Sequence, residues 1–153
     1  MTNLEELERK DKLKTKMLKY IMYKKRTEEE IKRKFVNIED SELVEEVMEE
    51  LKEIGYINDE SYIERAVTEH VNINNLSIKE LKYKLMSKGL NINLIEDYIV
   101  SKSEEMLEYE IESAKTIILK KQNTMEEQEI IQFLLKKGYR MDNIKEAISR
   151  LND

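Results

Sequence analysis

Two stretches of the chain, residues 77–99 (SIKELKYKLMSKGLNINLIEDYI) and residues 125–148 (MEEQEIIQFLLKKGYRMDNIKEAI), follow one pattern. Five positions recur at an offset of 49 residues: Leu81, Leu85, Gly89, Ile95 and Ile99 match Ile130, Leu134, Gly138, Ile144 and Ile148. Residues 27–35 (TEEEIKRKF) begin a third copy, about 50 residues earlier, in which residues 37–40 (NIED) replace the Lys-Gly turn. A period of this length indicates an internal repeat.

Each copy carries helix signals at matching places. Ser77 followed by Glu80, and Thr27 followed by Glu30, match the capping box that starts a helix. Apolar residues then follow at helical spacing. The glycine of each later copy stands where a helix ends with a left-handed residue, and another apolar helix follows. The pattern predicts a short helix, a turn and a second helix, with helix-turn-helix proportions.

A longer helical pattern precedes each pair, over residues 9–25, 59–73 and 104–121. The expected unit is therefore a long helix, a short helix, a turn and a last helix. The predicted residue ranges of the three repeats are 1–57, 58–102 and 103–153. We expect an all-α fold of three tandem three-helix repeats, stacked as an elongated, curved solenoid.

Composition supports helices and argues against several functions. The 153 residues include no Pro, Cys or Trp and three Gly, and 39% are charged. No apolar run is long enough to span a membrane, and the N-terminal residues lack a signal peptide's apolar core, so a cytoplasmic protein is expected. The single histidine, His70, has no second metal ligand or nucleophile beside it, so a structural or surface role is expected. We expect no cofactor, no metal and no enzymatic activity.

Charge is distributed unevenly along the chain, although the net charge is −6. Residues 8–36 hold 12 Lys and Arg against five Asp and Glu, whereas residues 37–75 hold two against 12. The basic block is an amphipathic helix followed by a second cationic segment. Such a surface attracts phosphate backbones or an acidic protein. The alternative is that these cations face the acidic helix predicted at residues 41–54, and the sequence leaves both open.

Three stretches resemble the RecX family, regulators of the RecA recombinase: residues 23–31 (YKKRTEEEI), 51–62 (LKEIGYINDESY) and 81–90 (LKYKLMSKGL). The resemblance covers residues 15–150 in order. It implies three tandem three-helix repeats and a protein that binds in the groove of the RecA–single-stranded DNA filament. Such a protein limits strand exchange and the coprotease activity of RecA in DNA repair and the SOS response, without catalysis of its own, and we expect a monomer.

One departure from the family bears on the partner. Family members often carry Arg and a Gly in the second repeat, whereas residues 70–76 read HVNINNL. This difference favours contact with RecA protein over DNA contact through the second repeat. Single-stranded DNA within the filament is a further expected partner, and no membrane partner is expected.

Exposed basic residues are the predicted contacts with the filament. The candidates are Lys24, Lys25, Arg26, Lys32 and Arg33 in the first repeat, Lys82, Lys84 and Lys88 in the second, and Lys136, Lys137 and Arg140 in the third. One alternative function is a helix-turn-helix DNA-binding protein that acts independently of RecA, which predicts salt-sensitive binding to naked DNA. Another is a helical adaptor for a different acidic protein.

Overall fold

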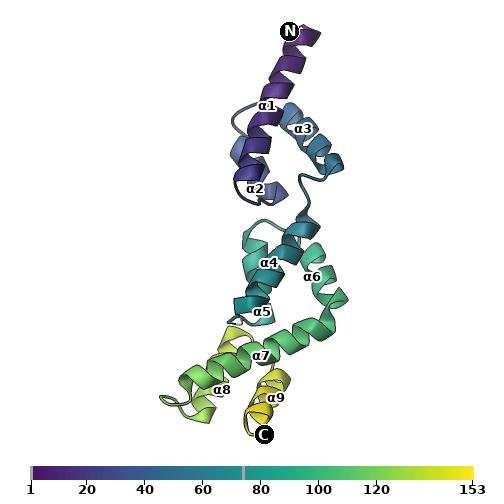
Figure 1. The fold of residues 1–153 in the computed structure, drawn as a ribbon. Helices are drawn as coiled ribbons and strands as arrows, with labels where there is room; N and C mark the ends of the chain where they lie inside the picture. The colour runs from purple at the N-terminus through teal and green to yellow at the C-terminus, as the bar shows by residue number, and fades with distance from the viewer. Residues whose placement is uncertain (1, 74) are drawn as a thin grey trace. The chain divides into compact units, whose positions relative to one another are not determined.

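The computed structural model describes residues 2–73 and 75–153, and every regular element in these ranges is an α-helix. A longer helix is followed by two shorter ones, three times over (Figure 1). The helices are α1 (Asn3–Tyr23), α2 (Glu28–Phe35), α3 (Ser41–Ile54), α4 (Asp59–Ile73), α5 (Ile78–Ser87), α6 (Ile92–Ser101), α7 (Ser103–Lys121), α8 (Glu127–Lys137) and α9 (Met141–Leu151). The predicted all-α class is confirmed, whereas the curved solenoid and the boundaries after residues 57 and 102 stay predictions.

Helix α1 begins at Asn3, several residues before the predicted start at residue 9. The reason is a further capping box, which was not predicted from the sequence. The Thr2 hydroxyl accepts a hydrogen bond from the Glu5 N–H at 3.1 Å, and the Glu5 carboxylate accepts one from the Thr2 N–H. The helix ends at Tyr23 because the backbone of Lys24 is extended, with φ −158° and ψ 142°.

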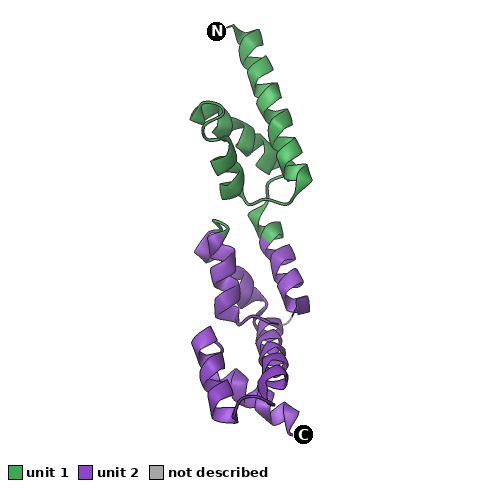
Figure 2. Ribbon diagram, turned by 90° about the vertical axis from the view of Figure 1, so that its left-hand side faces the viewer, with its two compact units in different colours: residues 1–62, 88–90 green, residues 63–87, 91–153 purple. Residues whose placement is uncertain are grey.

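Contacts divide the chain into two compact units, residues 1–62 with 88–90 and residues 63–87 with 91–153 (Figure 2). In the first unit, α1, α2 and α3 turn their apolar faces towards one core. The buried members are Leu13, Met17, Ile31, Phe35, Val44, Val47, Met48, Leu51 and Ile57. Full burial of one such side chain stabilises the fold by about 1.5–3 kcal/mol, so this core holds the three helices together.

The second unit has its own buried apolar residues. Helices α4 to α6 contribute Ile63, Val67, Leu81, Leu85, Ile95 and Ile99. A cluster spanning α7 to α9 contains Ile111, Ala114, Ile117, Ile118, Ile130, Leu134, Tyr139, Ile144 and Ala147. Helices α7 and α9 make the most extensive contact of any helix pair. Ala114 and Ala147 are both fully buried, and their small side chains let the two backbones approach closely.

The start of α2 is built into the first unit by its N-cap residue, Thr27, which is fully buried. The Thr27 hydroxyl accepts a hydrogen bond from the Glu30 N–H at 3.1 Å and donates one to the Lys88 carbonyl at 2.7 Å. The Asp59 carboxylate accepts a bond from the Glu28 N–H at 2.9 Å. Burial raises the pKa of Asp59, and the bond from Glu28 acts against that rise.

The same arrangement recurs at the start of α5 in the second unit, where the N-cap residue is Ser77. Its buried hydroxyl accepts from the Glu80 N–H at 3.0 Å and donates to the Lys137 carbonyl at 2.7 Å. The Glu110 carboxylate accepts from the Ile78 N–H at 2.9 Å. Each partner lies about 50 residues after its counterpart in the first unit. The predicted capping boxes at residues 27 and 77 are therefore confirmed, and each also forms a long-range connection.

Glu110 is fully buried in α7 and contacts two helix starts at once. Besides the Ile78 N–H of α5, it accepts bonds from the Arg140 N–H at 3.3 Å and from the Asn143 side-chain amide of α9. The free N–H groups of a helix start carry partial positive charge, so a carboxylate between two such starts is stabilised by both. This buried charge thus links three helices.

Glycine is required at the ends of α5 and α8. Gly89 and Gly138 have φ of +84° and +97°, in the left-handed region. A Cβ added to Gly89 would lie 2.6 Å from side-chain carbons of Glu29, and one added to Gly138 would lie 2.8 Å from the Cβ of Lys79. These turns therefore need both the backbone freedom and the small size of glycine.

We expect Gly138→Ala to destabilise the protein more than Gly55→Ala. Gly55 also has a left-handed φ of +99°, but a Cβ there would meet nothing within 4 Å. The control should lose about 1–2 kcal/mol from backbone strain alone. Gly138→Ala should lose more, because its Cβ also overlaps the Lys79 side chain. Urea unfolding followed by circular dichroism measures both, and equal losses would contradict the close approach.

Replacement of Glu110 by Gln should lower the free energy of unfolding by at least about 2 kcal/mol, since an amide NH₂ would face N–H donors and leave buried groups unpaired. Glu112→Gln is the matched control on the same helix. Glu112 forms only partly exposed ion pairs, with Lys115 at 3.3 Å and Arg150 at 3.4 Å. Its replacement should cost less than about 1 kcal/mol. Similar losses in the two variants would show that the buried carboxylate does not organise the helix starts.

Candidate partner-binding surface

The described residues offer little for catalysis. They contain no cluster of three or more His, Asp or Glu side chains suited to a metal ion. His70 lies on α4, where burial lowers the pKa of its imidazole and the nearby Lys84 ammonium lowers it further. The side chain is thus held neutral. None of the helices in the described ranges is both long and apolar enough to cross a membrane.

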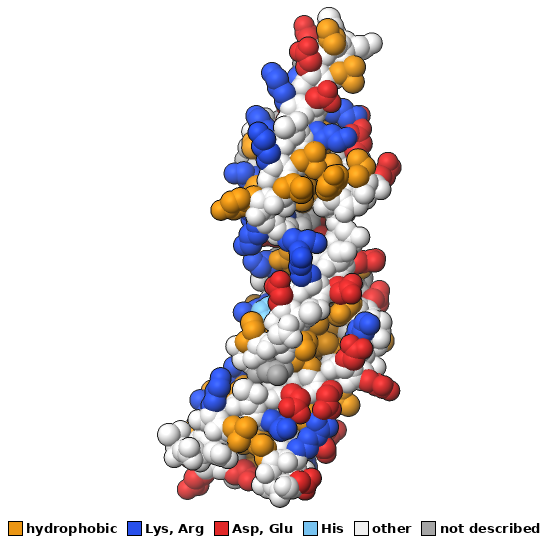
Figure 3. Space-filling view, in the orientation of Figure 1, with side chains coloured by type: hydrophobic (Ala, Val, Ile, Leu, Met, Phe, Trp, Pro, Cys, Tyr) orange, Lys and Arg blue, Asp and Glu red, His pale blue; other side chains and the backbone are white. Residues whose placement is uncertain are grey.

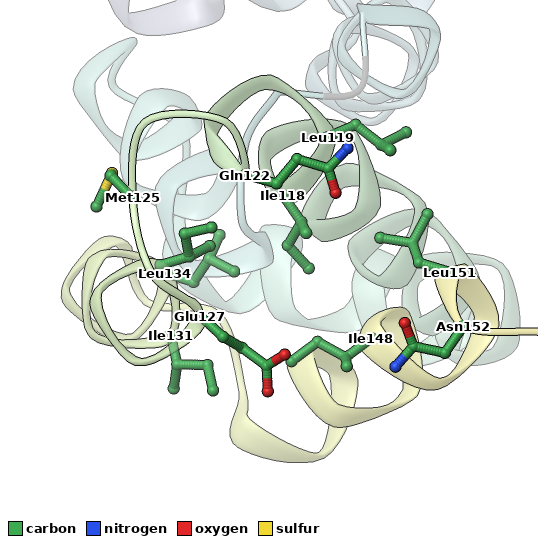
Figure 4. A pocket seen from close by; sticks show the side chains of 11 residues that line it. Ile118, Leu119, Gln122, Met125, Glu127, Ile131, Leu134, Ile148, Leu151 and Asn152 are labelled. Carbon is green, nitrogen blue, oxygen red and sulfur yellow. The ribbon is translucent and has the colours of Figure 1, made fainter.

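A hollow of about 350 Å³ lies among α7, α8 and α9 in the second unit (Figure 4). Apolar side chains form most of its wall, including Ile118, Leu134 and Ile148. Its polar lining consists of Gln122, Glu127 and Asn152, of which one is ionisable. A lone carboxylate beside apolar groups lacks the partner that acid–base chemistry needs. The hollow therefore does not suggest an active site.

One edge of α1 is paired with acidic residues of α3 and of the segment before it. Lys10 forms ion pairs with Glu46, at 3.0 Å, and with Glu50. Lys14 also pairs with Glu50, at 3.4 Å, and Arg9 pairs with Glu39 and Asp40. The pairing between the basic helix and the acidic helix, one of the two possibilities that the sequence left open, is therefore present along this edge.

Ion pairs shift the pKa values of Lys10, Lys32 and Glu50 in the direction that favours the charged form of each group. The bond from Lys10 lowers the pKa of Glu50, and the bonds to Glu50 and Glu46 raise the pKa of Lys10. On α2, the bond to Glu45 raises the pKa of Lys32 in the same way. Each of these three shifts favours the charged form, and the ion pairs leave little positive charge on the paired edge for a partner.

The other edge of α1 is not neutralised. Lys12, Lys16 and Lys19 lie three or four residues apart and so share one face of the helix. All three are exposed, as are Lys24 and Lys25 after the helix. Within the described residues none of these five forms an ion pair. Figure 3 shows Lys and Arg side chains gathered along one side of the α1–α2 bundle. We call these five residues the free cationic edge.

Next to this edge, two cations lie over one tyrosine ring. The Arg26 guanidinium carbon is 4.1 Å from the centroid of the Tyr20 ring, and the Lys34 Nζ is 5.7 Å from it. Phe35 packs edge-on against the same ring, at 5.8 Å and 87°. Such contacts contribute about 0.5–2 kcal/mol each. They hold two like charges close to one ring.

The structure corrects the expectation that Arg26 is fully exposed. The side chain is half-buried because it stacks on Tyr20, and its Nε–H is buried without a hydrogen-bond acceptor in the described part of the chain. A buried donor left unpaired costs about 1–3 kcal/mol. Sequence reasoning also missed Tyr20 and Lys34 as members of this cluster, and only the adjacency of an aromatic residue to a basic segment hinted at it.

Four other predicted contact residues are engaged within the protein. Each forms an ion pair with a carboxylate: Lys32 with Glu45 at 2.9 Å, Arg33 with Glu29 at 3.3 Å, Lys82 with Glu96 at 2.9 Å and Lys137 with Glu80 at 3.6 Å. They remain partly exposed, but their charge is largely compensated. They are therefore weaker candidates for a contact surface than the free cationic edge.

The remaining candidates are Lys84, Lys88, Lys136 and Arg140, which are exposed and form no ion pair among the described residues. Two of them contribute through their backbones instead. The Lys88 carbonyl accepts the Thr27 hydroxyl, and the Arg140 N–H donates to Glu110. Lys88 belongs to the first unit and the other three to the second. Among the eleven candidates, Lys24, Lys25 and Arg26 are consecutive residues of the first unit that form no ion pair within the described residues.

A longer helix followed by two shorter ones, three times over, with buried N-caps at Thr27 and Ser77 and an unpaired cationic edge in the first unit, defines an all-α protein of repeated helix triplets. Regulatory protein RecX of Staphylococcus haemolyticus is 32% identical to the chain over 139 residues, which are 88% of the chain and 52% of that protein. RecX of Finegoldia magna is 30% identical over 140 residues, 84% of the chain and 66% of that protein. No family model matches the chain.

Two solved structures have the same fold. The crystal structure of RecX from Lactobacillus salivarius matches with a TM-score of 0.78 and 25% identity, over 94% of this chain and 96% of that one. Another crystal structure of a regulatory protein RecX matches with a TM-score of 0.74 and 25% identity, over 92% and 73%. The chain belongs to the RecX family of regulatory proteins, as its sequence motifs predict. It spans about half to two thirds of the length of these curated relatives.

The paired edge of α1 should make the stability of the first unit depend on pH. The pKa of Glu50 is lower in the folded state than in the unfolded state. Its ion pairs therefore stabilise the fold fully at pH values above the unfolded-state pKa, and this stabilisation is lost as the pH falls through the folded-state pKa. We expect the Glu50→Gln variant to lose less stability than the wild type between neutral pH and about pH 3. Urea titrations at the two pH values measure this difference.

The control for this experiment is Glu53→Gln, which changes an exposed carboxylate on the same helix. It should leave the pH dependence close to that of the wild type. If Glu50→Gln and Glu53→Gln behave alike, the pairs between α1 and α3 do not contribute as described.

Proposed function

We propose that the protein binds the RecA–single-stranded DNA filament and inhibits the recombinase and coprotease activities of RecA. The observation that carries this proposal is membership of the RecX family together with the free cationic edge of the first unit. In this role the protein acts by binding alone, in the cytoplasm and as a monomer, during DNA repair and the SOS response. The whole curated relatives are longer, so any activity of their additional residues lies outside this proposal.

Charge distribution supports a binding role on a filament. A DNA-containing filament carries phosphate charges, and an unpaired row of lysines attracts such a surface over several ångströms. The acidic residues of α3 keep the other edge of α1 occupied, so the attraction is restricted to one side of the bundle. A partner with negative charge can therefore bind favourably in few orientations, with its charged surface against this side of the bundle.

A DNA-binding protein that acts without RecA is the second candidate. Helices α5 and α6 are joined by a short turn at Gly89, with the proportions of a helix-turn-helix pair. This function predicts tight, salt-sensitive binding to naked duplex DNA. Titration of duplex DNA with and without RecA separates the two candidates, because a filament regulator needs RecA for its main effect.

Charge reversal at two residues of the free cationic edge, Lys24→Glu with Lys25→Glu, should weaken inhibition of the DNA-dependent ATPase of RecA. Both side chains are exposed and make no ion pair within the described residues, so the fold should be unaffected. We expect the concentration for half-inhibition to rise about tenfold, which corresponds to about 1.4 kcal/mol.

The matched control reverses two exposed lysines of the second unit, Lys120→Glu with Lys145→Glu, and changes the net charge by the same amount. It should inhibit nearly as well as the wild type. If the wild type has no effect on the ATPase or on strand exchange, the proposed function is wrong. If both double variants lose inhibition equally, only the net charge matters and the edge is not a specific contact.

A further inference from the structure

The two cations that lie over the Tyr20 ring have no acidic partner within the described part of the chain. Arg26 and Lys34 both lie over the Tyr20 ring, at 4.1 and 5.7 Å from its centroid, and neither has a carboxylate partner among the described residues. Elsewhere in the same unit, cations such as Lys10 and Lys32 are paired with Glu side chains. The pair on Tyr20 is therefore positioned by an aromatic ring and left without a counter-charge.

Arg26 also has an unused donor. Its Nε–H is buried with no acceptor, while the side chain as a whole is half-buried. A guanidinium presents its N–H groups as a planar fork that matches the oxygens of a phosphate. An anion that draws this group slightly outward would give the orphaned Nε–H an acceptor, while the ring continues to orient the guanidinium.

The residues beside the cluster extend it along α1. Lys16, Lys19 and Tyr23 follow at spacings of three and four, so they share one face of the helix. Among the large apolar side chains of residues 2–73 and 75–153, Tyr23 is the most exposed, at 86%, although it lies at the end of a helix whose core face is well packed. Lys24 and Lys25 follow it directly. Proteins that bind single-stranded nucleic acids combine exposed aromatic rings, on which bases stack, with cations that contact the phosphates. Tyr23 and its neighbouring lysines have this combination.

We propose that this surface binds the backbone of a single-stranded nucleic acid. Arg26 and Lys34, positioned on Tyr20, contact one phosphate. Lys19, Lys24 and Lys25 contact neighbouring phosphates, and Tyr23 stacks on an unpaired base. The site deepens the proposed function, on which it rests, by assigning to the first unit the contact with DNA inside the filament.

Single-stranded nucleic acid fits this surface better than an acidic protein or a duplex. Acidic side chains within this chain pair with lysines and arginines, as Glu50 does with Lys10 and Lys14, and an ion pair of this kind needs no aromatic ring. An acidic protein would supply carboxylates for the cations but no unpaired base to stack on the exposed ring of Tyr23. A duplex would supply phosphates, but its bases are already stacked on one another and could not use the ring.

The test is binding of the full chain to a fluorescein-labelled oligothymidylate about 16 nucleotides long, which is the upper end of the site sizes of single OB-folds and so long enough for a surface of this extent. Fluorescence anisotropy over a series of salt concentrations gives the affinity and its salt slope. Each phosphate contact on a single strand contributes about 0.7 to the slope of log K against log salt. Because Arg26 and Lys34 share one phosphate, Arg26→Gln with Lys34→Gln should reduce the slope by about 0.7.

The matched control is Lys32→Gln with Arg33→Gln. It also removes two cations, from the same helix as Lys34, but both already form ion pairs with Glu side chains. Its slope should stay close to that of the wild type. Tyr23→Ala should weaken binding about tenfold and Tyr23→Phe should not, because both rings stack. Because Arg26 also packs on Tyr20, thermal melting of its variant checks that the fold is kept. Lys24→Gln with Lys25→Gln tests the site without changing a packed side chain.

Three results would overturn the site. One is a wild type that does not bind the oligothymidylate. Another is a salt slope that the Arg26 and Lys34 variant, or the Lys24 and Lys25 variant, leaves unchanged. The last is a pair of findings: the wild type does not bind the bare strand, and a variant of this surface loses binding to the RecA filament. That pair would identify an acidic protein surface as the ligand. Failure of the proposed function looks different, because it appears as a wild type without effect on the RecA ATPase.

Discussion

The fold depends on carboxylates that accept hydrogen bonds from the starts of other helices. Glu110 serves α5 and α9 in the second unit, and Asp59 serves α2 in the first. A helix that begins inside a protein brings N–H groups that water cannot reach, and each needs an acceptor. Placing one acidic side chain of the neighbouring long helix there satisfies these groups and offsets their positive charge. The apolar cores can then close around helix ends that would otherwise have to remain at the surface.

The same logic of compensation explains where binding can occur. In the first unit, acids of α3 neutralise Arg9, Lys10 and Lys14 on one side of α1, and the opposite side keeps its charge. A net charge of −6 therefore coexists with a locally cationic surface. The acidic total limits non-specific attraction to nucleic acids, while the free edge retains a directed one. Charge is thus separated by helix face rather than by domain.

Much of the fold could be predicted because its signals are local. The capping boxes at residues 27 and 77, the glycine turns and the helix period all depend on residues a few positions apart. The candidate site was predicted less well. Lys24 and Lys25 are exposed as expected, but the pairing of Lys82 with Glu96 or of Lys137 with Glu80 joins residues that no local pattern relates. The exposure of Arg26 was misjudged because Arg26 lies in the turn after α1, and the chain folds back there to stack its guanidinium on Tyr20 of that helix. Glu110 escaped notice as one carboxylate among many, although its apolar neighbours in α7 indicated burial.

The buried N-cap hydroxyl gives the repeat a direction. The hydroxyl comes from the earlier segment, at Thr27 and Ser77, and the carbonyl that accepts it comes from the later one, at Lys88 and Lys137. The third copy has Glu126 at the equivalent position, exposed and without a hydroxyl to donate. Copies that look alike in their helices are therefore not interchangeable in order. A designer who shuffles them, or a gene duplication that adds one, must carry the serine or threonine along with the helix that it starts.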